Sequence, residues 1–500
     1  MKENTITHVI CPYCCHKFPP SEADFRLNEP CIITEQTTGT GGKKTKKKPT
    51  SRSVNYGKEN DEKLYAYNSN VLRNPQKTSQ KNAMQYMAVS ITDENVAVDE
   101  EMKYGFPQKV VYTAEDGKEY ATQTRLCPNC HNTLPIGYGL RETILISIIG
   151  DARAGKSVYL TMLINALENN EDFSSKLNFI GDKDIKQNIF ESYQKPLLQE
   201  NILVDSTKRK KIPPFAYNYW YQYRDKDGSW AENTIDLIFY DIAGEDLRDD
   251  SAIRQNGFNI VDSSGLIFLI DPTNFGTMKD LFAIRDRALI DAVPKDNSVQ
   301  NIFSAMFNYF LGMDKEKSHI PVALAVSKAD LFGFAELSFF DNKPENRIQN
   351  TLENENYEGY VHMPSARGLH TEVRELLQHL NEDLILNNAS GCFKYINCFA
   401  VSSLGKKPII EQLTDPKTNK PIKKGRVDGE LQPFRIKEPF YWILFKNGLL
   451  NRYEDDGAYY ANGELTLAAE RASRALNSGQ AGFDIIAFIK KLFGIAPKED

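Results

Sequence analysis

The chain has 500 residues, of which 41% are hydrophobic and 26% charged, a composition that excludes a fibre or a fully disordered protein. Sixty-one Lys and Arg against 67 Asp and Glu give a net charge of −6, which is too mild to indicate binding to nucleic acid or an anionic membrane by bulk charge. No apolar run follows Met1 as in a secretory signal, and none reaches the ~18 residues of a membrane span, so we expect a cytoplasmic protein without a transmembrane segment.

Two Cys-Pro-x-Cys pairs, Cys11/Cys14 and Cys127/Cys130, bound the first section of the chain. Together they supply the four thiolates of a tetrahedral zinc site, and four sulfur ligands leave no position open for catalysis. Their separation exceeds the ~15–20 residues of a usual zinc ribbon, but the free energy of loop closure rises only logarithmically with length. We therefore predict a structural zinc site. Four unrelated reduced cysteines remain an alternative, and so do substitute ligands from the residues that follow the pairs: Cys15, His16 and His131.

The segment between the pairs contains a low-complexity basic stretch, Lys43–Arg52, whose composition predicts a flexible linker. Contact with nucleic acid is the weaker alternative, because no aromatic residues are interleaved with the lysines. Strands are expected at Met84–Ile91 and Lys109–Thr113, the second followed by a hairpin turn. We interpret residues 1–140 as a split zinc ribbon with a flexible basic insertion at about 17–126.

From Thr143 onward, apolar strands alternate with helical stretches, as in an α/β domain with a mainly parallel sheet and helices on both faces. This domain is expected to span residues 141–450. The predicted strands are Thr143–Ile149, Ala216–Tyr223, Thr234–Tyr240, Gly265–Ile270, Val322–Val326 and Tyr395–Val401. The second and third are joined by a turn sequence and should pair antiparallel. The predicted helices are Ser157–Glu168, Met278–Ala292, Val299–Leu311, Leu369–Leu386 and Glu438–Asn447.

The first strand of this domain runs into Gly150-Asp-Ala-Arg-Ala-Gly155-Lys156-Ser157, which fits the phosphate-loop pattern G-x-x-x-x-G-K-[ST]. The glycines let backbone amides turn toward phosphate, Lys156 neutralises the β/γ oxygens, and the Ser157 hydroxyl ligates Mg²⁺. The helix that begins here adds its positive N-terminus. The pattern predicts a nucleoside triphosphate site whose residues are Gly150, Asp151, Ala152, Arg153, Ala154, Gly155, Lys156, Ser157 and Val158.

Later strand ends add candidate residues for the metal and the base. Asp241 ends a buried strand and would hold Mg²⁺ through water, while the Gly244 amide would sense the γ-phosphate. Asp330, in Ser327-Lys328-Ala-Asp330, would accept hydrogen bonds from two guanine N–H donors that adenine lacks, with the Lys328 stem over the base. One more strand-end loop offers amides to guanine O6: Ser402, Ser403 and Leu404.

In order and strand context, these segments resemble the GTPases of the translation-factor/Ras-like (TRAFAC) class, from about Thr143 to Leu449. The resemblance implies a switch-loop Thr that ligates Mg²⁺. Thr207 is our candidate, Ser206 is its rival, and an ordinary polar loop is the third interpretation. Ser327 departs from the Asn or Thr usual before the Lys, which puts base affinity in question.

The resemblance also places Glu245 where Ras-like members carry a Gln that orients the attacking water. A carboxylate there repels the γ-phosphate, so we expect slow GTP hydrolysis. Arg153 is a candidate helper in cis, although a solvated surface Arg is the plainer interpretation. The residues expected to act in catalysis are Lys156, Thr207, Gly244 and Glu245.

A zinc ribbon before a phosphate-loop strand, followed by Asp241-Ile-Ala-Gly-Glu245 and Ile270-Asp271-Pro272-Thr273, is similar to the bacterial double-GTPase families. The resemblance implies GTP or GDP, Mg²⁺ and structural zinc as cofactors. It also implies a protein partner, either a second GTPase or an effector, in a bacterial defence or conflict system. The long insert between the cysteine pairs departs from a compact ribbon.

Residues 451–500 are predicted to form a C-terminal helical extension, with an amphipathic stretch at Phe483–Ile495 that docks on its own domain, on a partner or on a membrane. The sequence thus predicts a GTP-binding switch that hydrolyses GTP slowly. Two alternatives remain: a zinc-ribbon scaffold that binds nucleotide with little turnover, and a phosphate-loop ATPase, in which Asp330 would have no purpose.

Overall fold

The computed structural model describes a defined set of residues, namely 6, 8–35, 52–55, 59–71, 84–99, 105–150, 154–170, 174–181, 183–204, 214–242, 258–275, 302, 305–306, 317–330, 359–406, 408–414, 421–453 and 459–460.

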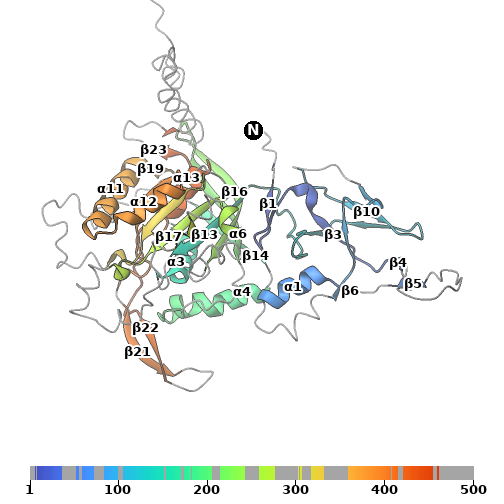
Figure 1. Ribbon diagram of the computed structural model, residues 1–500, viewed down its shortest axis with the longest axis horizontal. Coiled ribbons are helices and arrows are strands. Elements are labelled where there is room, and N and C mark those ends of the chain that lie inside the picture. The colour runs from blue at the N-terminus through green and yellow to red at the C-terminus, as the bar shows by residue number, and fades with distance from the viewer. Residues whose placement is uncertain are drawn as a thin grey trace, which may run out of the picture.

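A seven-stranded sheet forms the centre of the molecule, in the order β14-β15-β16-β13-β17-β18-β20 (Figure 1). Its strands are β13 (Thr143–Gly150), β14 (Ser175–Ile180), β15 (Phe215–Arg224), β16 (Trp230–Asp241), β17 (Gly265–Ile270), β18 (Val322–Val326) and β20 (Ile396–Ala400). The pairs from β16 to β20 are parallel, and β14, β15 and β16 pair antiparallel. The predicted fold class, mixed α/β with a mainly parallel sheet, is confirmed.

The strand predictions are close to the structure because continuous apolar runs in a parallel sheet are easily recognised. Each predicted strand from Thr143 onward matches an observed one within two residues at most ends, and the predicted β15–β16 hairpin is present. The third strand, β16, begins earlier than predicted, at Trp230. The edge strand β14 was missed, because its side chains alternate between exposed and half-buried and form no apolar run.

Two helices, α3 (Lys156–Glu168) and α13 (Glu438–Lys446), pack side by side against one face of the sheet. The Tyr159 hydroxyl on α3 donates to the carbonyl of Ile436, just before α13, at 2.8 Å. Phe440 on α13 contacts Phe239 of β16. Gly265 leaves room for α13, since a Cβ there would lie 2.4 Å from the Ile443 Cγ2 atom. These contacts belong to the main hydrophobic core, which extends over both faces of β17 and β18.

The opposite face of the sheet is covered over β13, β15 and β16 by the N-terminal section. Ile10 and Cys15 pack with a row of sheet residues that face away from α13: Leu145, Ala216 and Ile238. The linker to β13 is also fixed, because the Gly139 N–H donates to the buried Asp236 carboxylate at 3.0 Å. The residues on either side of the first cysteine pair thus pack against the strands that end in the phosphate loop and in Asp241.

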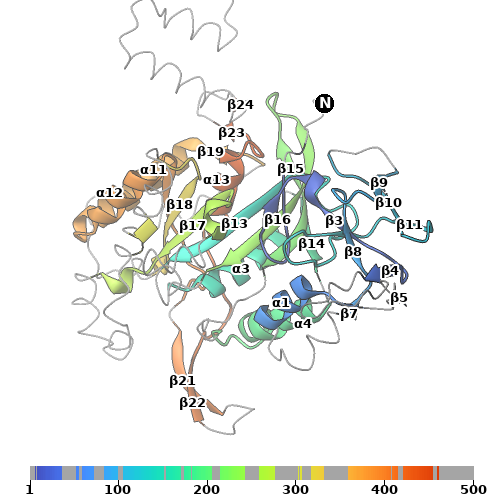
Figure 2. The same ribbon diagram turned by 45° about the vertical axis from the view of Figure 1, so that its right-hand side comes forward.

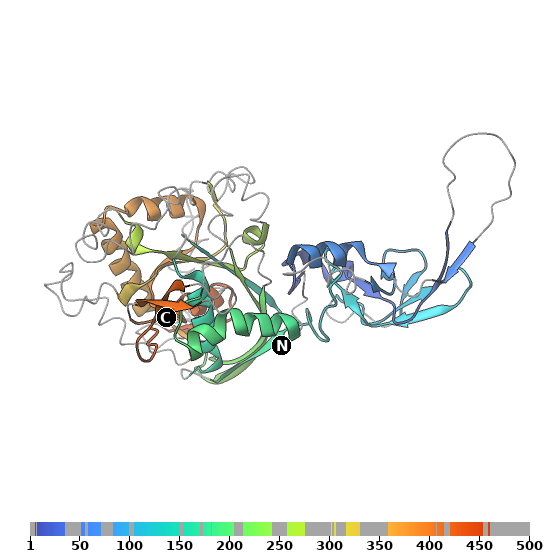
Figure 3. The same cartoon turned by 90° about the horizontal axis from the view of Figure 1, so that it is seen from below.

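The N-terminal section lies to one side of the sheet domain (Figures 2 and 3). Its strands are β1 (Val9–Ile10), β2 (Lys17–Phe18), β3 (Asp24–Arg26), β4 (Ile32–Glu35), β5 (Arg52–Asn55), β6 (Glu59–Asn60), β7 (Met84–Gln85), β8 (Ala88–Ser90), β9 (Val96–Val98), β10 (Val110–Thr113), β11 (Glu119–Thr122) and β12 (Arg125–Leu126), and its helix is α1 (Glu62–Val71). Phe25, Val89 and Val110 belong to a buried cluster of their own. The described parts of 17–126 are therefore folded, unlike the flexible insertion expected, because they bury apolar side chains. Most of the basic stretch Lys43–Arg52 lies outside the described residues.

The remaining elements flank the sheet domain. They are α4 (Lys183–Ile189), which continues as a π-helical segment (Phe190–Gln199), α6 (Phe258–Val261), α11 (Met363–His379), α12 (Asp383–Cys392), β19 (Val361–His362), β23 (Arg452–Tyr453), β24 (Tyr459–Tyr460) and a hairpin of β21 (Ile409–Thr414) and β22 (Pro421–Arg426). One predicted helix, Leu369–Leu386, is two helices, since Asn381 adopts a left-handed φ of 58°. The predicted helix Met278–Ala292, most of Val299–Leu311 and the amphipathic stretch Phe483–Ile495 lie outside the described residues.

Candidate functional site

The carboxyl ends of β13, β16, β17, β18 and β20 lie along one edge of the central sheet. The parallel register pairs Ile148 with Asp241 and Gly150 with Leu269, so the phosphate loop and the end of β16 are neighbours. On the other side of β17, Ile270 pairs with Val326, the last residue before Ser327. Open α/β sheets bind ligands at this edge. The topology therefore brings the predicted phosphate, magnesium and base residues together at one edge.

The two glycines of the phosphate loop have structural reasons to be glycine. A Cβ on Gly150 would lie 2.1 Å from the carbonyl oxygen of Leu269, so only glycine lets β13 run this close to β17. Gly155 has a left-handed φ of 83° and directly precedes α3. The Lys156 Nζ donates to the Gly150 carbonyl at 3.0 Å, which places the ammonium inside the turn of the loop. The N-terminus of α3 and the lysine thus face the same space.

Oxygen ligands suited to Mg²⁺ meet beside the phosphate loop. The Ser157 hydroxyl donates to Asp241 Oδ2 at 2.6 Å, and both side chains are buried. The other oxygen, Asp241 Oδ1, is buried without a hydrogen-bond partner. Burial raises the pKa of the Asp241 carboxyl, and the charge of Lys156 and the bond from Ser157 partly offset this. A hydroxyl and a carboxylate with one unused oxygen fit a hard divalent cation.

The base-binding candidates also come together. The Ser402 hydroxyl donates to Asp330 Oδ1 at 2.5 Å, and it accepts from the Gly405 N–H at 2.9 Å. The Ala329 N–H donates to the Val401 carbonyl at 3.0 Å, which fixes the two loops together. Burial raises the pKa of Asp330, and the bond from Ser402 opposes this. A carboxylate held in this way can accept from the N–H edge of guanine.

Lys328 lies between these loops and the end of β17. Its backbone has a left-handed φ of 54°, and its Nζ donates to Asp271 Oδ2 at 2.6 Å. Asp271 is almost completely buried, whereas the Lys328 side chain is 38% exposed. Ser403 and Leu404, the other predicted base contacts, are half-buried in the loop after β20. Val158, the last predicted phosphate-loop residue, lies in α3.

Several predicted site residues lie outside the described part of the chain. They are Asp151, Ala152 and Arg153 in the phosphate loop, Ser206 and Thr207 in the expected switch loop, and Gly244 and Glu245 after β16. Their roles stay predictions.

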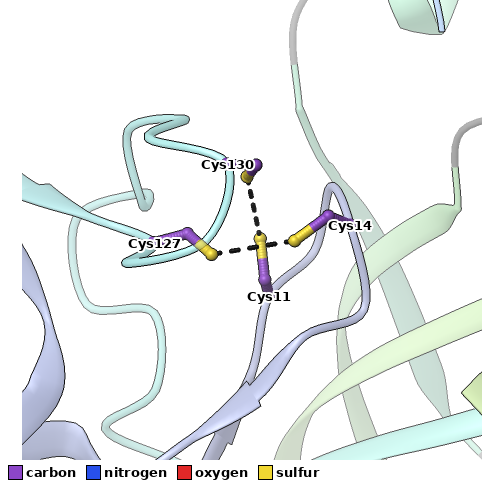
Figure 4. A group of neighbouring side chains, drawn as sticks. All are labelled: Cys11, Cys14, Cys127 and Cys130. Atoms are coloured by element: carbon purple, nitrogen blue, oxygen red, sulfur yellow. Dashed lines mark hydrogen bonds between the residues drawn. The ribbon is translucent and has the colours of Figure 1, made fainter. Parts of the chain in front are cut away.

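The four cysteines of the two pairs meet in a single cluster (Figure 4). Their sulfur atoms all lie within 4.8 Å of one another. Cys11 and Cys130 are 3.7 Å apart, and so are Cys14 and Cys127, although the latter two are 113 positions apart in sequence. In the described residues, no other group of three or more Cys, His, Asp or Glu side chains has this proximity.

The two cysteine turns have the same backbone design. In each, the carbonyl oxygen of the first Cys accepts a hydrogen bond from the backbone N–H four residues later, at Cys15 and at His131. Cys15 and His131 have left-handed φ angles of 56° and 51°. The backbone N–H of the first Cys donates to the carbonyl five residues later. Cys11 donates to His16 at 2.9 Å, and Cys127 donates to Asn132 at 3.1 Å. Two such turns face each other across the cluster. Four convergent thiols fit a tetrahedral zinc ion.

Neighbouring donors hold individual sulfur atoms in place. The Tyr13 N–H donates to Cys11 at 3.4 Å, and the Asn132 side chain donates to Cys130 at 3.2 Å. Burial raises the pKa of Cys11, while hydrogen bonds from the other three thiols hold the pKa of Cys14 well below its usual range. Four thiolates this close repel one another, so a bound cation would stabilise the cluster.

His131 has another role than the substitute ligand considered from the sequence. Its Nδ1 is 2.8 Å from Asp61 Oδ2, and its Nε2 is 3.1 Å from Asp24 Oδ2. Arg26 donates to the same Asp61 oxygen at 2.6 Å. This buried network fastens α1 and β3 to the second cysteine turn. Cys15, another substitute considered, packs against Leu145 of the central sheet.

Sequence reasoning missed the partners of two predicted residues. Asp271, which holds Lys328, was noted only as part of a family resemblance, although an Asp directly after a buried strand at the carboxyl edge was a usable signal. Asp61 and Asp24 had no local signal, because they approach His131 from distant parts of the chain.

The geometry defines a phosphate-loop nucleotide-binding domain of the GTPase type. Residues 144–381 match the sequence model of the Double-GTPase 2 family. The resemblance to the double-GTPase families that the sequence suggested is confirmed for this segment.

One curated protein shows similarity over a larger part of the chain. It is the "Putative ESX-1 scaffolding and assembly protein SaeC" of Mycolicibacterium smegmatis, 24% identical over 343 residues that cover 66% of this chain and 82% of that protein.

Solved structures with similarity to the chain include Sup35 complexed with GMPPNP, with a TM-score of 0.20 at 10% identity over 53% of this chain. A second is the GTP-bound Ski7 GTPase-like domain of S. cerevisiae, with a TM-score of 0.25 at 14% identity over 52% of this chain. A third is the SRb-GTP/SRX signal recognition particle receptor complex of Chaetomium thermophilum, with a TM-score of 0.22 at 12% identity over 53% of this chain. The chain spans 38%, 43% and 92% of these three structures, respectively.

Within the described residues, every helix is too short or too polar to cross a membrane.

Proposed function

We propose that this chain binds GTP with Mg²⁺ and hydrolyses it slowly, so that it acts as a molecular switch. One observation carries the proposal. Lys156, the Ser157–Asp241 pair and the Asp330–Ser402 pair lie at the ends of neighbouring strands along one sheet edge. The family match of residues 144–381 supports the same nucleotide.

Each residue has a distinct role in this proposal. Lys156 stabilises the charge of the β/γ-phosphate oxygens, and the amides at the start of α3 donate to them. Ser157 and Asp241 hold Mg²⁺, the latter through water. The ion would neutralise the charge that develops on the phosphates. Asp330 accepts from the guanine N–H donors, Ser402 orients that carboxylate, and the Lys328 stem covers the base.

Slow turnover follows from Glu245. A carboxylate in the position of the water-orienting Gln repels the γ-phosphate, so hydrolysis needs help from Thr207, from Arg153 or from a partner. A multiple-turnover rate above ~1 s⁻¹ for the isolated protein would contradict this part of the proposal.

Zinc is proposed to have a structural role. The four thiols of the cluster would hold it with no open position, and the first cysteine turn supports the face of the sheet behind the phosphate loop. Removing the metal is expected to destabilise the N-terminal section before the sheet domain unfolds.

A scaffold or adaptor that binds GTP with little turnover is the second candidate function. The similarity to a protein named for scaffolding and assembly favours it, and it would give the chain protein partners. Under either function, a second GTPase or an effector is the proposed partner. A role in bacterial defence rests only on the resemblance noted from the sequence.

GTP and ATP binding by the wild type, Lys156→Ala and Asp330→Asn tests the nucleotide assignment. We expect the wild type to bind GTP more tightly than ATP, and Lys156→Ala to weaken the binding of both nucleotides. Asp330→Asn should bind GTP about 100-fold more weakly than the wild type. It should gain affinity for xanthosine triphosphate, because the new amide donates to the 2-oxo group of xanthine. Equal affinity of the wild type for GTP and ATP would reject GTP and favour an ATPase.

Turnover then separates the switch from the scaffold. Measurable Mg²⁺-dependent GTP hydrolysis that Lys156→Ala abolishes supports the switch. Tight GTP binding with no turnover above the rate of the buffer alone supports the scaffold.

A further inference from the structure

The ends of β17 and β18 are fastened to each other next to the proposed base site. The Ser327 N–H and hydroxyl both donate to the Ile270 carbonyl, at 2.8 Å and 3.0 Å. Ser327 is shorter than the Asn that Ras-like members carry here, and its hydroxyl is already engaged below the loop. Ser327 therefore fixes the base of this loop, and its hydroxyl points toward β17.

The residue that follows β17 continues the attachment. Asp271 is 1% exposed, and its two carboxylate oxygens have different partners. Oδ1 accepts from the Thr273 N–H at 3.0 Å and from the Thr273 hydroxyl at 2.7 Å. Oδ2 accepts from the Lys328 Nζ at 2.6 Å. The turn through Thr273 thus fixes the rotamer of the carboxylate, which then receives the lysine.

Lys328 needs such a partner to keep one conformation. Its backbone is in the left-handed region, which is unfavourable for a residue with a Cβ, and a lysine side chain has many rotamers to lose. With its ammonium held at β17, the four-carbon stem must cross the space between β17 and Asp330. That is the surface over which the guanine plane would lie.

We propose that Asp271 is a positioning residue for guanine recognition, which holds Lys328 so that its stem forms one wall of the base site. The inference rests on the proposed function. It assigns the anchoring of Lys328 to the residue that directly follows β17. Asp271 itself touches no nucleotide. Its effect should therefore reach the base only through Lys328.

A double-mutant cycle tests this route. The variants are Asp271→Asn, Lys328→Ala and the pair, with Asp428→Asn, an exposed Asp outside the site, as the matched control. Affinity for GDP, GTP and ATP is measured by titration calorimetry, and folding is followed by thermal unfolding without nucleotide. In the wild-type background, we expect Asp271→Asn to lower the affinity for GDP and GTP about tenfold. In the Lys328→Ala background, the same substitution should lower these affinities by less than about twofold. Asp428→Asn should match the wild type.

Three results would overturn the inference: wild-type GTP affinity in Asp271→Asn, an equal loss in both backgrounds, or a parallel loss for every nucleotide together with early unfolding. If Asp271→Asn fails to fold, Thr273→Val serves instead, because it removes only a hydroxyl that orients the carboxylate. Thr273→Val is expected to lower the affinity for GDP and GTP about twofold to threefold. This loss must likewise disappear in the Lys328→Ala background. A wild type that does not prefer GTP to ATP would contradict the proposed function instead, so the two failures are distinguishable.

Discussion

The nucleotide site and the cysteine cluster are built in opposite ways. The nucleotide site takes its residues from successive strand ends, and the parallel register alone makes Gly150 and Asp241 neighbours. The cysteine cluster joins two copies of one turn from sites 113 positions apart, with other strands and a helix between them. A sheet can thus bring distant residues together without a ligand, whereas four thiolates at this distance repel one another and would be stabilised by a shared cation.

The two sites are connected through the sheet. The first cysteine turn packs through Cys15 and Ile10 on Leu145 and Ile238. Leu145 lies on the strand that ends in Gly150, and Ile238 lies three residues before Asp241. The strands that end in the phosphate loop and in Asp241 therefore rest on the first cysteine turn. The two sites can be tested separately, each with its own variant.

Loss of the metal should have the largest effect. We expect Cys127→Ser to abolish stoichiometric zinc binding, since three thiolates and a hydroxyl hold the ion far less well. Metal analysis of the purified protein measures this. The matched control is Cys31→Ser, which changes a buried cysteine of the same section that lies outside the cluster. Retention of one zinc per chain in Cys127→Ser would show that another residue completes the site.

Lys156→Ala should come next, with a loss of about 3 kcal/mol in GTP binding, because an ammonium at the phosphates is removed. Zinc content and thermal stability without nucleotide should not change, since the effect is confined to one site. Lys63→Ala provides a control, because Lys63 is half exposed beside the second cysteine turn. GTP affinity within threefold of the wild type would place the phosphates elsewhere.

Breaking the network around the second cysteine turn should destabilise the fold by about 2–3 kcal/mol. In Asp61→Ala, the buried Arg26 and His131 lose their shared partner. Burial alone would raise the pKa of Asp61, but bonds from His131, Leu64 and Arg26 outweigh it and lower the pKa to about 2. The contribution of Asp61 should therefore be complete above pH ~4 and disappear as the pH falls through 2.

Urea unfolding of the wild type and Asp61→Ala at pH 7 and at pH 3 measures this difference. Glu29→Ala, which breaks an exposed pair with Lys118, should change stability by less than about 0.5 kcal/mol. A difference between the wild type and Asp61→Ala that grows toward acid would contradict the assigned direction.

The smallest effect concerns pH and guanine binding. Burial raises the pKa of Asp330, and only the ionised carboxylate accepts both guanine N–H donors. GTP affinity should therefore be full at neutral pH and decline as the pH falls through this raised pKa. The decline should be absent in Asp330→Asn, which has no proton to gain. A fall of the same size in both proteins would assign the titration to the phosphates or to another group.

Much of the nucleotide site could be predicted from the sequence because its signals are local. Gly150, Lys156 and Ser157 fall within eight positions of one another, and Asp241 and Asp330 each follow an apolar strand. The cysteine pairs were equally visible because each turn is short and repeated. The strands at the sheet centre were found within a few residues, since parallel strands buried on both faces form continuous apolar runs.

Other features depended on contacts between distant residues. The position of Asp271 after a buried strand was a local signal, but no local pattern predicts that it pairs with Lys328, or that His131 meets Asp24 and Asp61. The break between α11 and α12 was missed because a left-handed Asn381 interrupts an otherwise helical apolar pattern. Likewise, the described parts of the insertion fold because Phe25, Val89 and Val110, far apart in sequence, belong to one buried cluster.

By itself, then, the sequence determined the reactive groups available to this protein: a phosphate-loop pattern, carboxylates at the ends of apolar strands and four thiols in two pairs. Tertiary structure decided which of these lie together. Strand order placed the nucleotide residues on one edge, and chain reversal over more than a hundred residues set the cysteine turns face to face. The physical reason is that residue type follows from local sequence, whereas distance and burial depend on how the whole chain packs.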